Sequence, residues 1–276
     1  RQSGRLLSLS KGCTEHKFRK LARQLGWLHR NLTGEFAEGT RFTLDEMQTF
    51  ETCRSTRPLT LPVVIEQDSL FVVAAECAPI KPSGAMPEHR KQRIRQQSQQ
   101  DGTEREDKSR ECLVRVLGVV KQHIKAGARL ILRSDEKGLY RTLAKQLFGD
   151  AVTIEQFPGT ARRDVRNPLF RINLTNAIAR DLNGRLRRWS WLVSKKGEFL
   201  NLQLGIFQVY RNYVRRRVNA DPRTPAQALG FVQRPFTSQE VVSWRQDWGR
   251  MSLHPAVLPP TEIGAAAAVG VAAVAS

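Results

Sequence analysis

The sequence predicts an α/β domain in which helices cover a mixed sheet. Three short runs rich in β-branched and aromatic residues lie between residues 42 and 77, and helical and strand patterns alternate after residue 112. A meander followed by such alternation gives a sheet that is part antiparallel and part parallel. The 276 residues, 40% of them hydrophobic, are enough for one sizeable domain with small appendages.

The first predicted elements are a basic helix and a three-stranded meander. Ser10 is a suitable cap for a helix that reaches about Arg30, in which Leu21, Leu25 and Leu28 recur at helical steps. The turn residues 67–69 and Pro58 separate the runs that follow. We therefore predict antiparallel strands at Phe42–Met47, Leu59–Glu66 and Leu70–Cys77.

The second half of the domain is predicted to alternate helices with strands. Residues 79–110 are polar, charged and rich in glutamine, which indicates a flexible surface insertion rather than core. After them we expect a helix over 113–124, a strand at 129–133, a helix over 139–147, a strand at 152–157, and helices over 168–186 and 195–218. This order of elements is that of the ribonuclease H-like fold.

The charge balance favours a polyanionic partner. Lys and Arg number 45 against 26 Asp and Glu, a formal net charge of +19. Nucleic acid is the first expectation, and an anionic membrane surface is the second. No apolar stretch is long enough to span a bilayer and no secretory signal precedes the first helix, so we expect no membrane partner and a cytoplasmic, nucleoid-associated protein.

Cysteine spacing and the chain start give two smaller expectations. Four widely spaced cysteines without a C-x-x-C pair indicate reduced thiols rather than a zinc site or a disulfide framework. The first residue is Arg1 rather than methionine, which indicates a piece of a longer protein or of an incompletely read gene.

Three carboxylates are candidates for metal-assisted phosphate chemistry. Asp45 lies in the first predicted strand, and Asp135 follows the strand at 129–133, at the kind of edge where open α/β sheets place their sites. Glu198 is the only acid between residues 185 and 217, and its spacing with Leu202 predicts that it faces inward. Together these acids could hold two Mg²⁺ ions, with Mn²⁺ as a substitute.

Each acid also has a structural interpretation. Strand parity leaves open whether Asp45 or Glu46 points toward Asp135. Asp135 could cap the helix that follows it. Glu198 could pair with a nearby arginine or favour the positive end of its own helix.

Basic and amide side chains near these acids are candidates for phosphate contact. Trp189 and Trp191 lie within the basic stretch, where aromatic rings can stack on bases or pack in the core. Asn173, Asn176 and Arg180 share one helical face, suited to contacting phosphate or orienting an acid, although an ordinary polar surface would look the same. The remaining DNA-binding candidates are Arg187, Arg188, Lys195, Lys196, Arg215, Arg216 and Arg217.

Several blocks resemble the insertion-sequence transposases that use an Asp-Asp-Glu triad, particularly the IS-one group. Those blocks are 44–46, 133–137, Asn173-Leu174 with Arg180, and the Ser-Trp-Leu-Val-Ser-Lys-Lys-Gly-Glu run at 190–198, the most specific of them. Residues 210–217, 224–230 and 243–249 are also similar to the ends of such proteins.

The resemblance implies that Asp45, Asp135 and Glu198 form the triad of a DNA transposase. Such an enzyme cuts double-stranded DNA at transposon ends, joins the 3′-hydroxyl to a target strand, and generally acts as a homo-oligomer on DNA. It also implies a partial helix-turn-helix in residues 1–36, with a recognition helix over 14–25; no zinc ribbon accompanies it. The DNA-contacting residues of that helix would be His16, Lys17, Arg19 and Lys20.

The implied organisation is a catalytic domain at 37–220, a C-terminal extension at 221–260 and a disordered Ala- and Val-rich tail at 261–276. Two alternatives stay open. One is a catalytically inactive DNA-binding transposase remnant or regulator, and the other is a structure-selective nuclease of the same fold.

Overall fold

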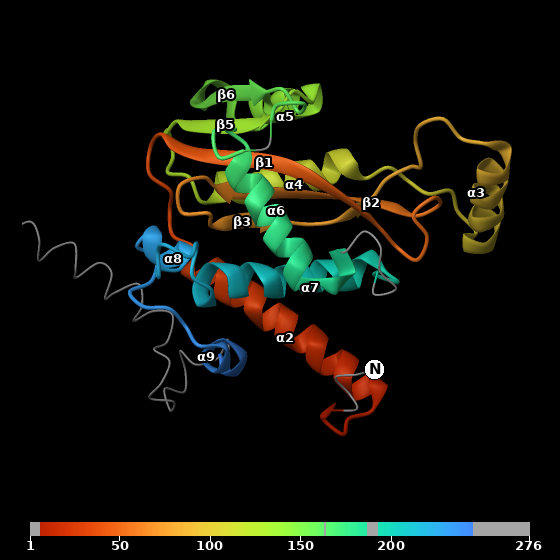
Figure 1. Cartoon of the computed structure of the whole chain (residues 1–276), viewed down its shortest axis with the longest axis horizontal. Helices are drawn as coiled ribbons and strands as arrows, with labels where there is room; N and C mark the ends of the chain where they lie inside the picture. The colour runs from red at the N-terminus through yellow and green to blue at the C-terminus, as the bar shows by residue number, and fades with distance from the viewer. Residues whose placement is uncertain (1–5, 163, 187–192, 245–276) are drawn as a thin grey trace, which may run out of the picture. The chain divides into compact units, whose positions relative to one another are not determined.

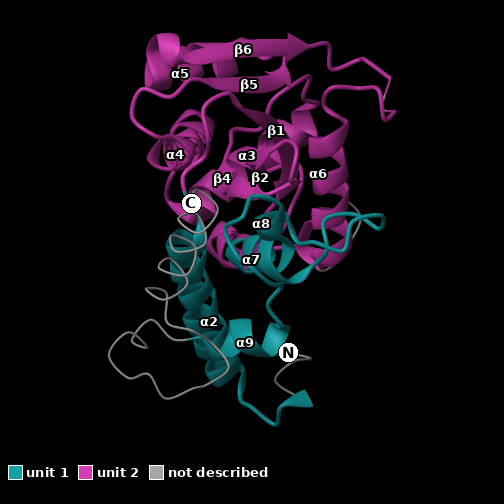
Figure 2. Cartoon of the chain, turned by 90° about the vertical axis from the view of Figure 1, so that its left-hand side faces the viewer, with its two compact units in different colours: residues 1–34, 205–276 teal, residues 35–204 magenta. Residues whose placement is uncertain are grey.

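The computed structural model describes residues 6–162, 164–186 and 193–244 (Figure 1). The chain divides into two compact units, Glu35–Leu204 and the combination of Arg1–Gly34 with Gly205–Ser276 (Figure 2). The predicted DNA contacts Arg187 and Arg188, and the tail after residue 244, lie outside the described residues. In the described part of the chain, no helix combines the length and the apolar composition that a membrane crossing requires.

The larger unit, Glu35–Leu204, is built on a mixed sheet with the order β3-β2-β1-β5-β6, and β4 pairs with β2. β1 pairs antiparallel with β2 and parallel with β5, β2 pairs antiparallel with β3, and β5 pairs parallel with β6. This order confirms the predicted ribonuclease H-like fold. The strands are β1 (Thr40–Phe50), β2 (Pro58–Glu66), β3 (Val72–Ala75), β4 (Ala78–Pro79), β5 (Leu130–Asp135) and β6 (Val152–Phe157).

Helices cover both faces of this sheet. Figure 2 shows α4 and α5 on one face and α6 on the other. β2 runs between these layers, and all its residues after Pro58 are buried, as expected for a strand covered on both faces. The helices and short 3₁₀ turns of this region are α3 (Glu88–Asp101), α4 (Ser109–Gln122), α5 (Gly138–Phe148), η1 (Gly149–Ala151), α6 (Phe170–Leu182), η2 (Gly184–Leu186) and α7 (Gly197–Val209).

The structure refines two predicted segments. Residues 79–110, predicted to be a flexible surface insertion rather than core, contain the helix α3, whose 14 residues include no buried side chain. The strong helix formers of Glu88–Asp101 therefore form a helix without any core contact. The helix expected over 195–218 begins at Gly197 and ends at Val209.

The chain after α7 is held in a turn by Arg211. One π-helical turn, η3 (Tyr210–Val214), follows α7, and Arg215 is already extended. The buried Arg211 guanidinium donates hydrogen bonds to the carbonyl oxygens of Arg216 (3.2 Å) and Arg217 (2.9 Å). Arg215, Arg216 and Arg217 therefore follow the helix rather than end it.

The smaller unit combines the N-terminal helix with the C-terminal segment. α2 (Lys11–Leu32) begins at Ser10, whose hydroxyl accepts the Cys13 N–H at 3.1 Å, and it buries Leu25 and Leu28 as predicted. Its last turn reaches the buried Tyr213, whose hydroxyl lies 3.2 Å from His29 Nδ1. The other helices of this unit are α8 (Pro225–Ala228) and α9 (Ser238–Ser243).

A cysteine prediction tests this fold. Burial would raise the pKa of the Cys53 thiol, but hydrogen bonds from Ser55 and the backbone of the same turn lower it to about 7. Because the thiolate is the reactive form, iodoacetamide should alkylate Cys53 with a half-maximal rate near pH 7, increasing as the pH rises. Cys77 and Cys112 are buried with raised pKa values, so they should react only after unfolding.

The measurement is mass spectrometry of labelled peptides between pH 5.5 and 9. Ser55→Ala is the matched variant, and it should move the Cys53 profile toward the ordinary thiol value of about 8.5. Equal labelling of Cys112 and Cys53 in the native protein would contradict the packing described here.

Candidate metal and nucleic-acid site

The register of two parallel strands places Asp45 beside Asp135. Thr43 of β1 pairs with Arg133 of β5. Asp45 and Asp135 come two residues further along each strand, past the last paired residues, and the charge of Asp135 acts on Asp45, so the two acids lie near each other on one face of the sheet. Two carboxylates in that arrangement repel each other unless a cation or donor compensates them.

Asp45 is the more enclosed of the two acids. Its side chain is half-buried, and Oδ2 accepts a hydrogen bond from Asn176 Nδ2 at 2.8 Å. Burial is the main cause of a raised pKa at Asp45, and the Asp135 charge also raises it, while a hydrogen bond from the Glu46 backbone and the Arg180 charge lower it. This environment disfavours the ionised carboxylate without a compensating cation.

Asp135 ends β5 and stays half-exposed. Its Oδ1 accepts the backbone N–H of Lys137 at 3.1 Å, which turns the chain toward α5. The helix-cap interpretation is therefore only partly correct, because the residue at the cap position of α5 is Lys137 and makes no side-chain cap bond. The hydrogen bond engages one of the two carboxylate oxygens of Asp135.

Glu46 is engaged separately from this pair. Its carboxylate lies 2.8 Å from Lys137 Nζ and accepts the Thr60 hydroxyl at 3.0 Å. Because neighbouring residues of a strand face opposite sides, Glu46 points away from the α6 face on which Asp45 lies. Strand parity, which the sequence left open, thus puts Asp45 and not Glu46 with Asp135.

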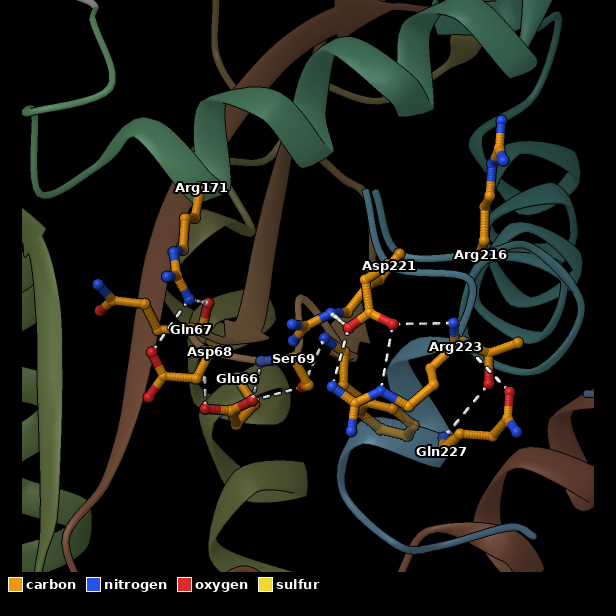
Figure 3. Close-up of polar contacts among 12 residues, drawn as sticks. Glu66, Gln67, Asp68, Ser69, Arg171, Arg216, Asp221, Arg223 and Gln227 are labelled. Atoms are coloured by element: carbon orange, nitrogen blue, oxygen red, sulfur yellow. Dashed lines mark hydrogen bonds and ion pairs between the residues drawn. The ribbon is translucent and has the colours of Figure 1, made fainter. Parts of the chain in front are cut away.

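The turn between β2 and β3 fixes α6 over the two acids. Arg171, in the first turn of α6, donates to the Gln67 carbonyl oxygen at 2.8 Å and to Asp68 Oδ1 at 3.0 Å (Figure 3). The Gln67 side chain in turn accepts hydrogen bonds from Thr43 and from Arg133, the residues that precede the acids by two positions. The strand register and the position of α6 therefore share one hydrogen-bonded network.

Within α6, two of the three residues of the predicted polar face act on Asp45. Asn176 is 3% exposed and contacts Asp45, and the Arg180 charge acts on Asp45. Asn173 is half-exposed, one turn before Asn176.

Glu198 lies in the first turn of α7, next to the far end of β1 from Asp45. It is exposed, so the prediction that it faces inward is wrong; the buried residues of the helix are offset from it and include Leu200 and Leu204. The N–H of the preceding residue, Gly197, donates to Glu51 Oε1. Glu51 comes directly after β1, which ends at Phe50. Phe50 lies five residues beyond Asp45, or about 17 Å along the strand.

The structure thus brings two of the three predicted acids together. In the described ranges, no three His, Cys, Asp or Glu side chains are grouped as a set of metal ligands. The groups present at Asp45 and Asp135 are carboxylate oxygens with a buried amide beside them. These hard oxygen donors fit Mg²⁺ or Mn²⁺ and do not fit a soft metal such as Cu(I).

The basic residues predicted to contact DNA differ in how available they are. His16, Lys17 and Lys20 are exposed on α2, whereas Arg19 is half-buried and pairs with Glu15 at 3.2 Å. In the same unit Arg217 pairs with Asp221 at 2.6 Å, and Arg223 pairs with that acid at 2.9 Å (Figure 3). Arg216, Lys195 and Lys196 are also exposed.

A cleft in the larger unit adds further cations. It has a volume of about 580 Å³ and is lined by Arg54, Lys81 and Arg90 together with residues from the end of β1 and the start of β2. It therefore lies toward the Glu51 end of β1 and not at the Asp45–Asp135 pair.

Sequence reasoning did not identify the residues that position the site. Glu51, Gln67 and Arg171 have no motif around them, and each acts through a partner at least 66 residues away. The only available signal was the polar Gln67-Asp68-Ser69 turn, which indicated a turn but no partner.

Comparisons with known proteins give fold-level likeness only. No protein-family description matches the chain, and no curated protein matches it by sequence. Among solved structures, the catalytic domain of Mos1 mariner transposase is 14% identical with a TM-score of 0.26, over 71% of this chain and 92% of that one. A chain of a simian T-cell lymphotropic virus intasome in complex with PP2A regulatory subunit B56 gamma is 10% identical with a TM-score of 0.30, over 83% of this chain and 63% of that one.

A third similar structure is the Mos1 mariner paired end complex with Mn, which is 11% identical with a TM-score of 0.29 over 71% of this chain and 61% of that one. The fold assignment of this chain follows from its own strand order and register.

Replacing Glu51 should destabilise the larger unit. Glu51 accepts hydrogen bonds from the Gly197 N–H and from Arg105, and the side chains of Glu51 and Arg105 are only 15% and 18% exposed. Glu51→Ala therefore leaves two part-buried donors without this acceptor. We expect a loss of about 2–4 kcal/mol in the free energy of unfolding, measured by urea denaturation. Glu51→Gln, which keeps an acceptor for Gly197, should lose less.

The control is Glu88→Ala on α3, where the acid is exposed and its pairs are on the surface. That change should cost less than about 0.5 kcal/mol. Equal losses for Glu51→Ala and Glu88→Ala would contradict the anchoring role of Glu51.

Proposed function

We propose that this protein is a metal-dependent DNA strand-transfer enzyme of the transposase type. It would cut a phosphodiester at the end of a DNA element and direct the exposed 3′-hydroxyl against a target strand. The observation that carries the proposal is the Asp45–Asp135 pair, held side by side on the parallel part of a ribonuclease H-like sheet in a chain of net charge +19.

Asp45 and Asp135 would hold Mg²⁺, or Mn²⁺ in its place. Such an ion supplies activation of a water or hydroxyl nucleophile and stabilisation of the leaving oxygen in an in-line displacement. Asn176 donates a hydrogen bond to the Asp45 carboxylate in the structure, and Arg180 adds positive charge beside it, where a scissile phosphate would lie. The Lys137 N–H fixes one oxygen of Asp135, which limits the orientations of that carboxylate.

The third acid of the proposed triad remains a prediction. Glu198 is exposed in the first turn of α7, and the contact between Gly197 and Glu51 fixes where that turn begins. The proposal of metal-dependent chemistry is supported by the two aspartates without it. Glu198→Gln tests its part, since a triad member should be as sensitive to substitution as Asp45.

Substitution of the paired acids is the direct test of function. Asp45→Asn and Asp135→Asn each remove a negative charge that binds the metal, so each should strongly reduce strand cleavage and joining. Removing an outer hydrogen-bond partner of a metal ligand typically costs about 10–100-fold, and the loss of a ligand should exceed that. The assay mixes labelled DNA ends, a target plasmid and Mg²⁺ or Mn²⁺, and follows both cut and joined products.

DNA retention should survive both substitutions, because cations and not these acids supply the affinity for phosphate. Cuts without joined products would favour the structure-selective nuclease, and DNA retention with neither product would favour the inactive remnant or regulator. Undiminished activity in both aspartate variants would exclude the proposed site.

Lys195 and Lys196 provide a test of DNA contact in the same unit. Both are exposed immediately before α7. If both contact phosphate, the double change Lys195→Gln with Lys196→Gln should make the slope of log K against log salt shallower by about 1.8, because each duplex phosphate contact contributes about 0.9. Fluorescence anisotropy at several salt concentrations measures that slope.

The matched control is Lys125→Gln, an exposed lysine in the loop between α4 and β5. It should leave the slope unchanged within error. An unchanged slope in the double variant would exclude both lysines from the DNA contact.

A further inference from the structure

Asn176 is a buried amide of which only one end is satisfied. Its Nδ2 donates to Asp45 Oδ2 at 2.8 Å, and its side chain is 3% exposed. Its Oδ1 accepts no hydrogen bond from the described part of the chain. A buried carbonyl oxygen without a donor is unfavourable, so its retention beside two carboxylates calls for a ligand that provides positive charge.

The position of this amide is fixed by the fold. Arg171 holds the first turn of α6 to the β2–β3 turn, and five residues later Asn176 meets Asp45. The strand register puts Asp135 beside Asp45 on this face. The amide of Asn176 therefore lies against Asp45, with Asp135 near it.

A purely structural role would leave this arrangement incompletely satisfied. Orienting Asp45 uses only the NH₂ end of the amide and leaves both the orphan oxygen and the repulsion between the acids uncompensated. A divalent cation held by the two acids would compensate their repulsion directly, and it would compensate the amide oxygen once the carboxamide has turned toward it, because Mg²⁺ and Mn²⁺ take carboxylate and amide oxygens as ligands. When an ion is bound, rotation of the Asn176 carboxamide would turn Oδ1 toward the acids and Nδ2 away from them.

We propose that the Oδ1 of Asn176 is a ligand of the divalent cation held by Asp45 and Asp135, so that α6 supplies the third oxygen of the site. The inference rests on the proposed function for the existence of that cation, but it concerns a residue that the three-acid hypothesis does not include. An amide ligand adds no charge, so the two aspartates alone would neutralise the ion.

Metal binding by the full-length chain tests this inference without reference to catalysis. The probe is Mn²⁺ alone, followed by electron paramagnetic resonance of the free ion. Asn176→Leu keeps the approximate volume but removes the oxygen, and we expect the dissociation constant for Mn²⁺ to rise at least tenfold. Asn176→Asp keeps an oxygen and should bind Mn²⁺ at least as tightly as the unchanged protein.

Thr175→Val is the matched control. Thr175 is buried on the same helix, and its hydroxyl donates only to the Arg171 carbonyl oxygen within α6. It should leave Mn²⁺ binding unchanged, with circular dichroism confirming that each variant folds. Mn²⁺ binding by folded Asn176→Leu with unchanged affinity would overturn the inference.

A second measurement uses the unchanged protein and covers the case in which Asn176→Leu does not fold. Titration of asparagine-labelled protein with Mg²⁺ should shift the Asn176 side-chain amide resonances, assigned with Asn176→Asp, because coordination releases the NH₂ group from Asp45. Resonances that stay in place at saturating Mg²⁺ would also overturn it. If Mn²⁺ binding depends on Asn176 but no DNA is cut or joined, the inference stands and the proposed function fails. If DNA is cut and joined but Asn176→Leu leaves Mn²⁺ binding unchanged, the proposed function stands and the inference fails.

Discussion

The parallel pairing of β1 with β5 is the constraint on which the candidate site depends. It brings together two strands that are separated in the chain by three other strands and by helices α3 and α4, and it does so in the register that pairs Thr43 with Arg133. A shift of one residue in that register would send one of the two aspartates to the opposite face of the sheet. The apolar residues that β1 and β5 bury on the other face resist such a shift, because it would expose them.

The polar network on the α6 face reinforces that register. The Gln67 side chain accepts hydrogen bonds from both members of the Thr43–Arg133 pair, while its backbone carbonyl holds Arg171 of α6. One turn residue thus connects two strands and the covering helix. Because hydrogen bonds in such a network depend on each other's geometry, the position of Asn176 over Asp45 is a consequence of contacts made well away from the acids.

The other end of β1 has a separate organisation. Glu51 joins the start of α7 to Arg105, and basic residues line the cleft nearby. The exposed lysines before α7 lie in the same part of the sequence, so the cations of the larger unit are not confined to the surroundings of the aspartates. A long polyanion can contact several such groups at once, which a small metabolite cannot do.

Most of the fold was predictable from the sequence, because alternation of strand and helix patterns and the spacing of apolar residues are local properties. The meander, the strands around residues 132 and 154, and the polar face of α6 are all such cases. The direction in which Glu198 points was not predictable from the sequence, because α7 begins at Gly197 and buries a face that includes Leu200 and Leu204. The sequence by itself determined most of the elements and the net charge of +19, which predicts a polyanionic partner. Only the tertiary structure decided that Asp45 rather than Glu46 meets Asp135 and that Asn176 accompanies them, since strand register and helix placement arise from contacts between residues distant in the chain.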